Sequence, residues 1–134
     1  MASRAPISAL CTTEFVAAPA WAQDPLEGAV LYADLCSACH GADLRGEGPM
    51  APVLTVPPAD LTRLGAGADV PTLAVARQID GRDPMAAHGG EMPLFGPWVQ
   101  GNGADVAMTG PGGQPILMAR PIANLIAFLM EVQS

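Results

Sequence analysis

Lysine, aromatic residues and long apolar runs are scarce or absent in this sequence, and each shortage excludes a class of protein. There is no lysine, and 6 arginines stand against 13 acidic residues, which gives a formal net charge of −7. Phosphate binding needs a basic face, so nucleic acid is not an expected partner. No stretch reaches the ~18 uninterrupted apolar residues of a membrane-spanning helix, so no transmembrane anchor is expected.

The scarcity of aromatic residues bears on the core. They make up 4% of the 134 residues, although 50% are hydrophobic, and the chain holds 15 glycines and 14 prolines. This composition indicates a single loop-rich domain. A rigid prosthetic group at the centre would supply the apolar surface that the side chains do not.

Cysteine is scarce as well, and Cys11 falls in a segment with the features of a secretory leader. Arg4 precedes a mostly small and apolar stretch, which ends in the A-x-A cleavage motif Ala20-Trp21-Ala22. Residues 1–22 are therefore predicted to be a signal peptide, cleaved after about Ala22. Residues 23–134 would then form one periplasmic domain.

Apolar residues recur at helical spacing in three segments of the remaining chain, and the expected helices span residues 24–39, 71–80 and 121–131. Asp24 followed by Pro25 is typical of an N-cap and a first helical residue, and Gly81 is a typical helix end. Segments 106–109 and 114–118 flank a Gly-Pro-rich turn and predict a small hairpin. The apolar faces expected on the three helices are Leu26, Ala29, Val30 and Ala33; Leu73, Ala76 and Ile79; and Ile122, Leu125, Ile126 and Leu129.

The most specific motif is Cys36-Ser37-Ala38-Cys39-His40, a C-x-x-C-H sequence that is typical of c-type haem attachment. Two thiols three positions apart at a helix end can each add to one haem vinyl group, and the adjacent histidine can then ligate the iron. A covalent tether suits an exported protein, which cannot reload a lost cofactor. We therefore expect one covalent haem c, with Cys36 and Cys39 as thioethers and His40 as the proximal iron ligand.

Two other interpretations of the motif stay open. A redox-active thiol pair also uses C-x-x-C, but in such proteins a strand precedes the motif, whereas a helix is predicted here. A zinc site needs four ligands, for which the chain offers Cys36, Cys39, His40 and His88. Neighbouring Cys39 and His40 do not match the usual paired spacing of zinc ligands, so haem is favoured.

On these residues the chain resembles the small monohaem c-type cytochromes of bacteria, the class I cytochrome c family, over residues 26–133. Gly28 and Tyr32 on the first helix and Phe128 on the last match the crossing of helices in that family. The resemblance implies an all-α cytochrome c fold, with about three main helices and long loops wrapped around one haem. It also implies that the carbonyl of Pro49, in Gly48-Pro49, accepts a hydrogen bond from the free ring nitrogen of His40.

The sixth iron ligand is expected to be Met92. Methionine opposite histidine raises the reduction potential, and Met92-Pro93 follows the middle helix, where the family has its distal ligand. Pro93 also holds the loop extended. His88 is the runner-up. Met85 follows the same helix but is not followed by proline. Met50 is too near the haem motif, Met130 is expected to pack in the core, and Met108 and Met118 flank the predicted hairpin.

Weaker signals surround this site. Arg45 and Arg63 either pair with haem propionates or are simply solvated. Trp98 either donates its N–H to a propionate or packs on the ring edge. The segment 57–62 is expected to pack against the haem edge.

The predicted function is that of a diffusible electron carrier and not of an enzyme, because nothing resembles a catalytic base, a nucleophile pair or a second cofactor site. Redox proteins are the expected partners, with a basic docking patch to match the acidic chain. Two alternatives remain. One is a haem c subunit of a larger periplasmic dehydrogenase or oxidase, and the other is a ligand-binding or peroxidase-type cytochrome with an open sixth site. The oligomeric state is left open.

Overall fold

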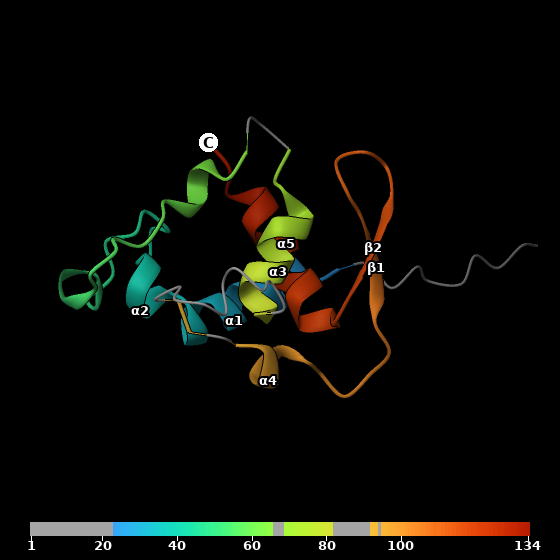
Figure 1. Ribbon diagram of the computed structural model, residues 1–134, viewed down its shortest axis with the longest axis horizontal. Helices are drawn as coiled ribbons and strands as arrows, with labels where there is room; N and C mark the ends of the chain where they lie inside the picture. The colour runs from blue at the N-terminus through green and yellow to red at the C-terminus, as the bar shows by residue number, and fades with distance from the viewer. Residues whose placement is uncertain (1–22, 66–68, 82–91, 94) are drawn as a thin grey trace, which may run out of the picture.

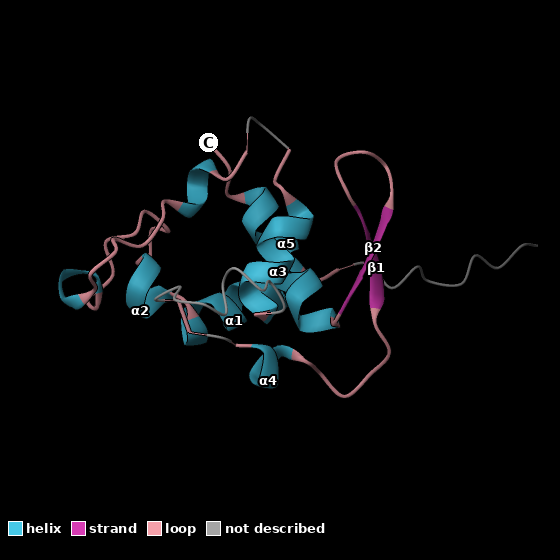
Figure 2. Ribbon diagram, in the orientation of Figure 1, coloured by secondary structure: helices cyan, strands magenta, loops and turns pink. Residues whose placement is uncertain are grey.

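The computed structural model describes residues 23–65, 69–81, 92, 93 and 95–134, so the predicted signal peptide lies outside the described residues. Three long helices form its centre, α1 (Pro25–Leu35), α3 (Thr72–Asp80) and α5 (Arg120–Glu131), and long loops join them (Figures 1 and 2). In the described ranges, no helix has the length and apolar character needed to cross a membrane. The shorter elements are α2 (Ser37–His40), η1 (Ala51–Val53), η2 (Leu61–Arg63), α4 (Gly96–Val99), β1 (Val106–Thr109) and β2 (Pro115–Met118).

Helix α1 begins as the sequence predicts. The Asp24 side chain accepts hydrogen bonds from the N–H groups of Leu26 (2.9 Å) and Glu27 (3.3 Å), and proline occupies the first turn. The predicted helix over 24–39 is nevertheless two helices. At Cys36 the backbone angle φ is −116°, outside the helical range, although ψ (−32°) is helical, and α2 then carries the rest of the C-x-x-C-H motif.

The predicted buried face of α1 is wrong, because Leu26 is 78% exposed and Val30 62% exposed. The packed face instead carries Gly28 and Tyr32. A Cβ atom at Gly28 would overlap the Asn124 carbonyl of α5, so glycine is what allows the two helices to approach. The crossing implied by the family resemblance is confirmed, with the Tyr32 and Phe128 rings 5.5 Å apart.

The other two long helices match their predictions closely. All four residues of the apolar stripe expected on α5 are buried. In α3, Ala76 and Ile79 are buried, whereas Leu73 is 40% exposed. Helix α3 ends at Gly81, which adopts a left-handed conformation (φ 74°) and donates its N–H to the Arg77 carbonyl at 2.9 Å.

The predicted hairpin is confirmed, with β1 antiparallel to β2 and Val106 opposite Met118. Met108 and Ile116 are buried, and Leu117 on the outer face is 69% exposed. Helix α4 is a single turn that the sequence does not predict, because four residues are too few for a periodic pattern. The architecture is therefore mostly helical with one small two-stranded sheet.

Candidate functional site

A cavity of about 770 Å³ opens between the three long helices and the loop that contains η2. Its volume lies within the roughly 300–1,000 Å³ of pockets that hold cofactors and other small ligands. Most of its lining is apolar. No aspartate, glutamate or arginine is found among the described residues that line it. The cavity can therefore enclose a large, flat, apolar group.

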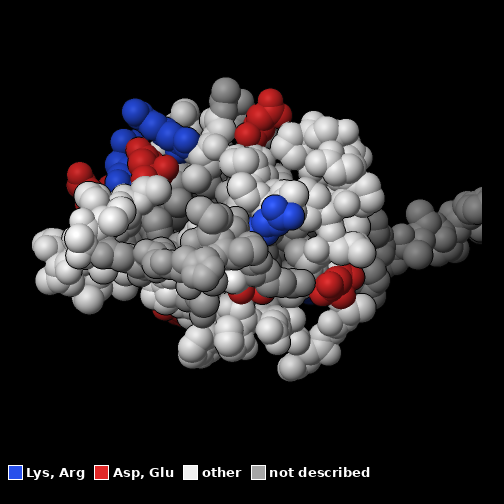
Figure 3. All heavy atoms as spheres, viewed as in Figure 1, with Lys and Arg blue, Asp and Glu red and all other residues white. Residues whose placement is uncertain are grey.

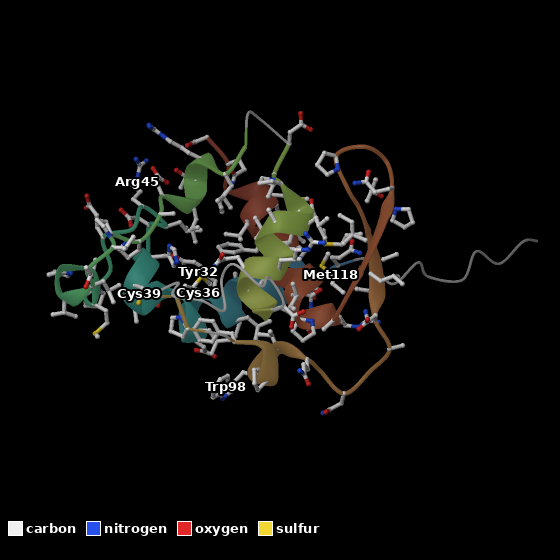
Figure 4. All side chains as sticks on the ribbon, viewed as in Figure 1. Tyr32, Cys36, Cys39, Arg45, Trp98 and Met118 are labelled. Atoms are coloured by element: carbon white, nitrogen blue, oxygen red, sulfur yellow. The ribbon has the colours of Figure 1, made fainter. Side chains whose placement is uncertain are left out.

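The three predicted attachment residues, Cys36, Cys39 and His40, all line this cavity. Cys36 ends α1, Cys39 lies on α2, and Figure 4 shows both beside Tyr32. Both cysteines are free. Burial, together with the neighbouring Cys39, raises the pKa of the Cys36 thiol to about 11. A redox-active pair requires a lowered thiol pKa, so this environment disfavours the interpretation as redox thiols.

The ring of His40 is oriented by a backbone carbonyl. Its Nδ1 atom lies 3.0 Å from the carbonyl oxygen of Ala59. Since a carbonyl oxygen only accepts, Nδ1 must carry the hydrogen, and Nε2 keeps the lone pair that an iron ligand needs. This is the tautomer found in histidine metal ligands.

The expectation that Pro49 supplies this carbonyl is wrong. The Gly48-Pro49 turn instead packs on the backbone of α2: the Gly48 N–H donates to the Cys39 carbonyl at 3.0 Å, and the next turn residue, Met50, donates to the Ala38 carbonyl at 2.9 Å. Ala59 follows Pro57 and Pro58, which lack backbone N–H groups. These three residues and Leu61 line the cavity, whereas Asp60 and Thr62 of the segment 57–62 do not.

Tyr32 is a site residue that the sequence assigns only to helix packing. It is 4% exposed, lines the cavity, and donates its hydroxyl to the carbonyl of Gly41 at 2.5 Å. Burial, with smaller contributions from Cys36 and then Asp43, raises its pKa to about 12. Its bond holds the turn that follows His40 against α1.

Met92 is the one methionine that lines the cavity among the five in the described part of the chain. Its sulfur lies 3.8 Å from Nε2 of Gln78 on α3. Met50 is 47% exposed. Met118 is buried at the end of β2, and Figure 4 shows it well apart from the two cysteines. The runner-up His88 lies outside the described residues.

Three other candidates do not line the cavity: Arg45, Arg63 and Trp98. Arg63 Nε lies 3.8 Å from Asp60 Oδ2, and the Arg63 side chain is 73% exposed. Trp98 is 71% exposed and contacts the edge of Phe95, which does line the cavity. Their geometry favours solvated arginines and a surface tryptophan.

The cavity, its apolar lining and the C-x-x-C-H residues on its wall define a protein suited to hold a c-type haem. The chain matches the cytochrome c family over residues 26–133 and belongs to that family. Membership implies covalently bound haem c, haem-based electron transfer and redox proteins as partners, and its members are typically electron carriers. No curated protein and no solved structure matched the chain.

Proposed function

We propose that this protein is a periplasmic carrier of single electrons that holds one haem c. Cys36 and Cys39 form its thioethers, and His40 and Met92 ligate the iron. One observation carries the proposal: the C-x-x-C-H residues and a single methionine of the described chain line the same apolar cavity. When bound, the haem supplies an iron centre that accepts and returns one electron.

The chain's own residues orient the ligands and tune the site. The Ala59 carbonyl accepts the Nδ1 hydrogen of His40, which fixes the ring and increases the basicity of Nε2. The apolar lining excludes water and disfavours additional positive charge, and a thioether ligand is a weak donor. Both effects favour reduced iron and raise the potential. If His40 and Met92 hold the iron as proposed, no position would be left on it for a substrate, which supports a carrier and not an enzyme.

The proposed partner presents a basic docking patch. The full chain carries a formal charge of −7, and Arg4 and Glu14 cancel within residues 1–22. The domain that remains after leader cleavage therefore keeps the full negative charge. Complementary charge would steer encounter with a basic partner.

The test is an absorption spectrum of the exported protein, oxidised, reduced, and reduced under carbon monoxide. We expect a low-spin c-type spectrum that carbon monoxide does not change. Met92→Ala should keep the attached haem, bind carbon monoxide and have a lower potential, whereas Met50→Ala, at an exposed methionine outside the cavity lining, should match the wild type. Carbon monoxide binding to the wild type, or an unchanged Met92→Ala variant, would refute His/Met ligation.

The mass of the exported protein tests the other two parts of the proposal. One haem per chain and a mature start at residue 23 are expected. A second haem mass, or a retained leader, would contradict them.

A further inference from the structure

We propose that the free edge of strand β2 is a self-association surface: two copies of this chain pair antiparallel through Leu117, and their hairpins join into one continuous sheet. The described residues of β2 and of the groove beside it do not line the haem cavity. Figures 1 and 4 show this separation, with the hairpin and Met118 well apart from α2 and the two cysteines. The inference therefore does not rest on the proposed function.

The register of the hairpin determines which backbone groups face outward. The Gly110 N–H donates to the Gln114 carbonyl at 2.8 Å, so this pair is hydrogen-bonded, and hydrogen-bonded pairs alternate with non-hydrogen-bonded pairs from there along the strands. Leu117, opposite Ala107, is in a non-hydrogen-bonded pair, so its N–H and C=O both point away from β1. Among the described residues, none forms a hydrogen bond with either group.

The two edges of the hairpin differ in accessibility. On the β1 edge, the outward carbonyl of Ala107 already accepts from Gln23 Nε2 at 3.1 Å. The β2 edge instead borders a groove of about 290 Å³ between β2 and α3. Leu117 is 69% exposed, and Leu73 on the α3 wall of the groove is 40% exposed. A further strand can therefore reach the β2 edge and would bury apolar surface there.

The free edge is complementary to a second copy of itself. With Leu117 opposite Leu117 of the second copy, each N–H donates to the other's carbonyl, which is a two-fold symmetric contact. Two residues further on, the N–H of Ala119 meets the carbonyl of Pro115, since the Met118 carbonyl faces β1 and a trans peptide points its N–H the opposite way. The reverse bond is not needed, because Pro115 has no N–H and the Ala119 carbonyl accepts from Ala123 at 3.1 Å.

This match selects one register. A shift of two residues in one direction would put the Leu117 carbonyl opposite Pro115, which has no donor. A shift in the other direction would put the Leu117 N–H opposite the Ala119 carbonyl, which Ala123 already uses. A second copy of the chain, paired at Leu117, is therefore the occupant that leaves no outward group of the edge without its partner.

Charge permits this contact on an otherwise acidic chain. No charged residue lies between Asp105 and Arg120, so both strands and their turn are uncharged. Charged side chains on an edge strand normally prevent such pairing, and this hairpin has none. The α3 wall of the groove carries one charge of each sign, Arg77 and Asp80, so a second copy meets complementary charge there and not only like charge.

The contact is small, and the dimer is therefore expected to be weak. A pairing of four-residue strands with its flanking groove stays below the roughly 1,200 Å² of a stable interface. We expect a dissociation constant on the order of 0.1 mM, so the monomer should predominate at about 10 µM and the dimer at about 1 mM.

Sedimentation velocity of the haem-loaded protein over this concentration range measures the association of the wild type, Leu117→Pro and Ala107→Pro. At either position proline removes an outward N–H that β1 and β2 do not use between them. Ala107→Pro is the matched control, because it changes the opposite edge of the same hairpin. Circular dichroism and the haem absorption spectrum check that each variant is folded.

The wild type and Ala107→Pro should dimerise alike, whereas Leu117→Pro loses two bonds per dimer and should dimerise roughly thirtyfold more weakly. A wild type that stays monomeric at the highest concentration would overturn the inference and favour an extended segment of another protein as the occupant. Equal dimerisation of Leu117→Pro, or its loss in Ala107→Pro, would also overturn it, because the copies would then meet elsewhere.

A cysteine at the same position tests the register even if Leu117→Pro does not fold. Directly opposite residues of a hydrogen-bonded pair have Cα atoms about 5.5 Å apart, within the range of a disulfide. Mild oxidation of the haem-loaded protein should therefore link two Leu117→Cys copies about tenfold faster than two copies of Ala107→Cys, because association brings only the former thiols together. Equal rates in the two variants would contradict pairing through Leu117.

Discussion

Tyr32 joins the packing of the helices to the geometry of the haem-attachment motif. Its ring contacts Phe128 on α5, and its hydroxyl donates to the carbonyl of Gly41, directly after His40. The same side chain therefore connects the core to the turn that follows His40, the proposed proximal ligand. A movement of α1 relative to α5 would be transmitted to His40 through this contact.

Replacing Tyr32 with phenylalanine should keep the ring packing and remove the hydrogen bond. The Gly41 carbonyl would lose the tyrosine donor and keep the Leu44 N–H at 3.2 Å, so we expect the free energy of unfolding to fall by about 1 kcal/mol. Urea unfolding of the haem-loaded protein measures this. Ser37→Ala is the matched control, since its hydroxyl donates to the Ala33 carbonyl at 2.6 Å in a solvent-exposed position, and it should cost no more than about 0.5 kcal/mol. Equal losses in the two variants would contradict the prediction.

The raised pKa of Tyr32 predicts a stability loss at alkaline pH. The hydroxyl titrates near 10.0 in an unfolded chain and near 12 in the folded protein. Between these values the unfolded chain has released the proton that the folded protein still binds, so stability falls as pH rises. The contribution is fully present below pH 10 and is lost as pH rises through about 12. Urea titrations across this window should give a shallower decline for Tyr32→Phe than for the wild type, and parallel profiles would contradict the assignment.

At the residue scale, side-chain identities were easier to predict than backbone partners. Cys36, Cys39, His40 and Met92 were chosen from the sequence, and these four residues line one cavity. The carbonyl that holds His40 was predicted wrongly, because it is Ala59, 19 residues away along the chain. Backbone carbonyls are the same in every residue, so only the path of the folded chain determines which one reaches the ring.

At the scale of elements, the crossing of α1 and α5 depends on close backbone approach. Besides the Gly28 contact, the amide of Asn124 on α5 accepts from the Asp24 N–H at 2.9 Å and donates to Glu27 at 2.8 Å. Asn124 is 2% exposed. The start of α1 is therefore bonded to the middle of α5, which fixes how α1 is placed along its partner.

Gly28→Ala should separate the two helices. The added methyl group would overlap the Asn124 carbonyl and come within 2.9 Å of Phe128 Cβ, so we expect a loss of about 1–3 kcal/mol in stability. Gly103→Ala is the control, because a Cβ there meets nothing within 4 Å. Thermal unfolding of both haem-loaded variants measures the difference. A Gly28→Ala protein as stable as Gly103→Ala would show that the crossing can relax without cost.

A second link between elements lies at the C-terminus. The Gln133 amide donates to the carbonyls of Leu61 (2.8 Å) and Leu129 (2.6 Å), and its oxygen accepts from the Leu64 N–H at 2.9 Å. Leu61 and Leu64 line the cavity. The end of α5 therefore holds one wall of the haem site in place.

Gln133→Ala should leave two backbone groups of that wall without their partner and lower stability by about 1–3 kcal/mol. Guanidinium unfolding measures this loss, and Gln100→Ala, at an exposed glutamine, serves as the control. If the two variants unfolded at the same denaturant concentration, water would be replacing Gln133 without loss.

Most helix positions were predictable from the sequence, but hydrophobic periodicity gave the wrong packed face for α1, which only the family resemblance indicated through Gly28 and Tyr32. Capping residues and helix-ending glycine act locally, which is why Asp24 and Gly81 were identified correctly. Apolar residues occur on several sides of α1, so their spacing does not single out one face. Gly28 marks the packed face because it has no side chain. Hydrophobic periodicity does not detect it, because glycine counts as neither apolar nor polar.

At the scale of the whole molecule, charge is distributed unevenly around the cavity. The chain carries a formal charge of −7, yet no aspartate, glutamate or arginine lies among the described residues that line the site. Figure 3 shows arginine and acidic side chains together at the upper left, an isolated arginine near the centre, and separate acidic side chains at the top and the lower right, with uncharged surface between them. Asp60 partly neutralises the positive charge of Arg63 at η2.

This distribution predicts how electron exchange responds to salt. A long-range negative field attracts cations and repels anions, and salt screens it over about 10 Å at 0.1 M. Oxidation of the reduced protein by a cobalt phenanthroline cation should therefore slow on the order of tenfold between low and high salt, and oxidation by ferricyanide should accelerate. Stopped-flow rates measure both. The double variant Asp105→Asn/Glu131→Gln, which removes two exposed negative charges, should flatten both dependences. The opposite signs would mean that Arg45 and Arg63 dominate the field where electrons leave the haem, and the partner would then have to present an acidic patch and not a basic one.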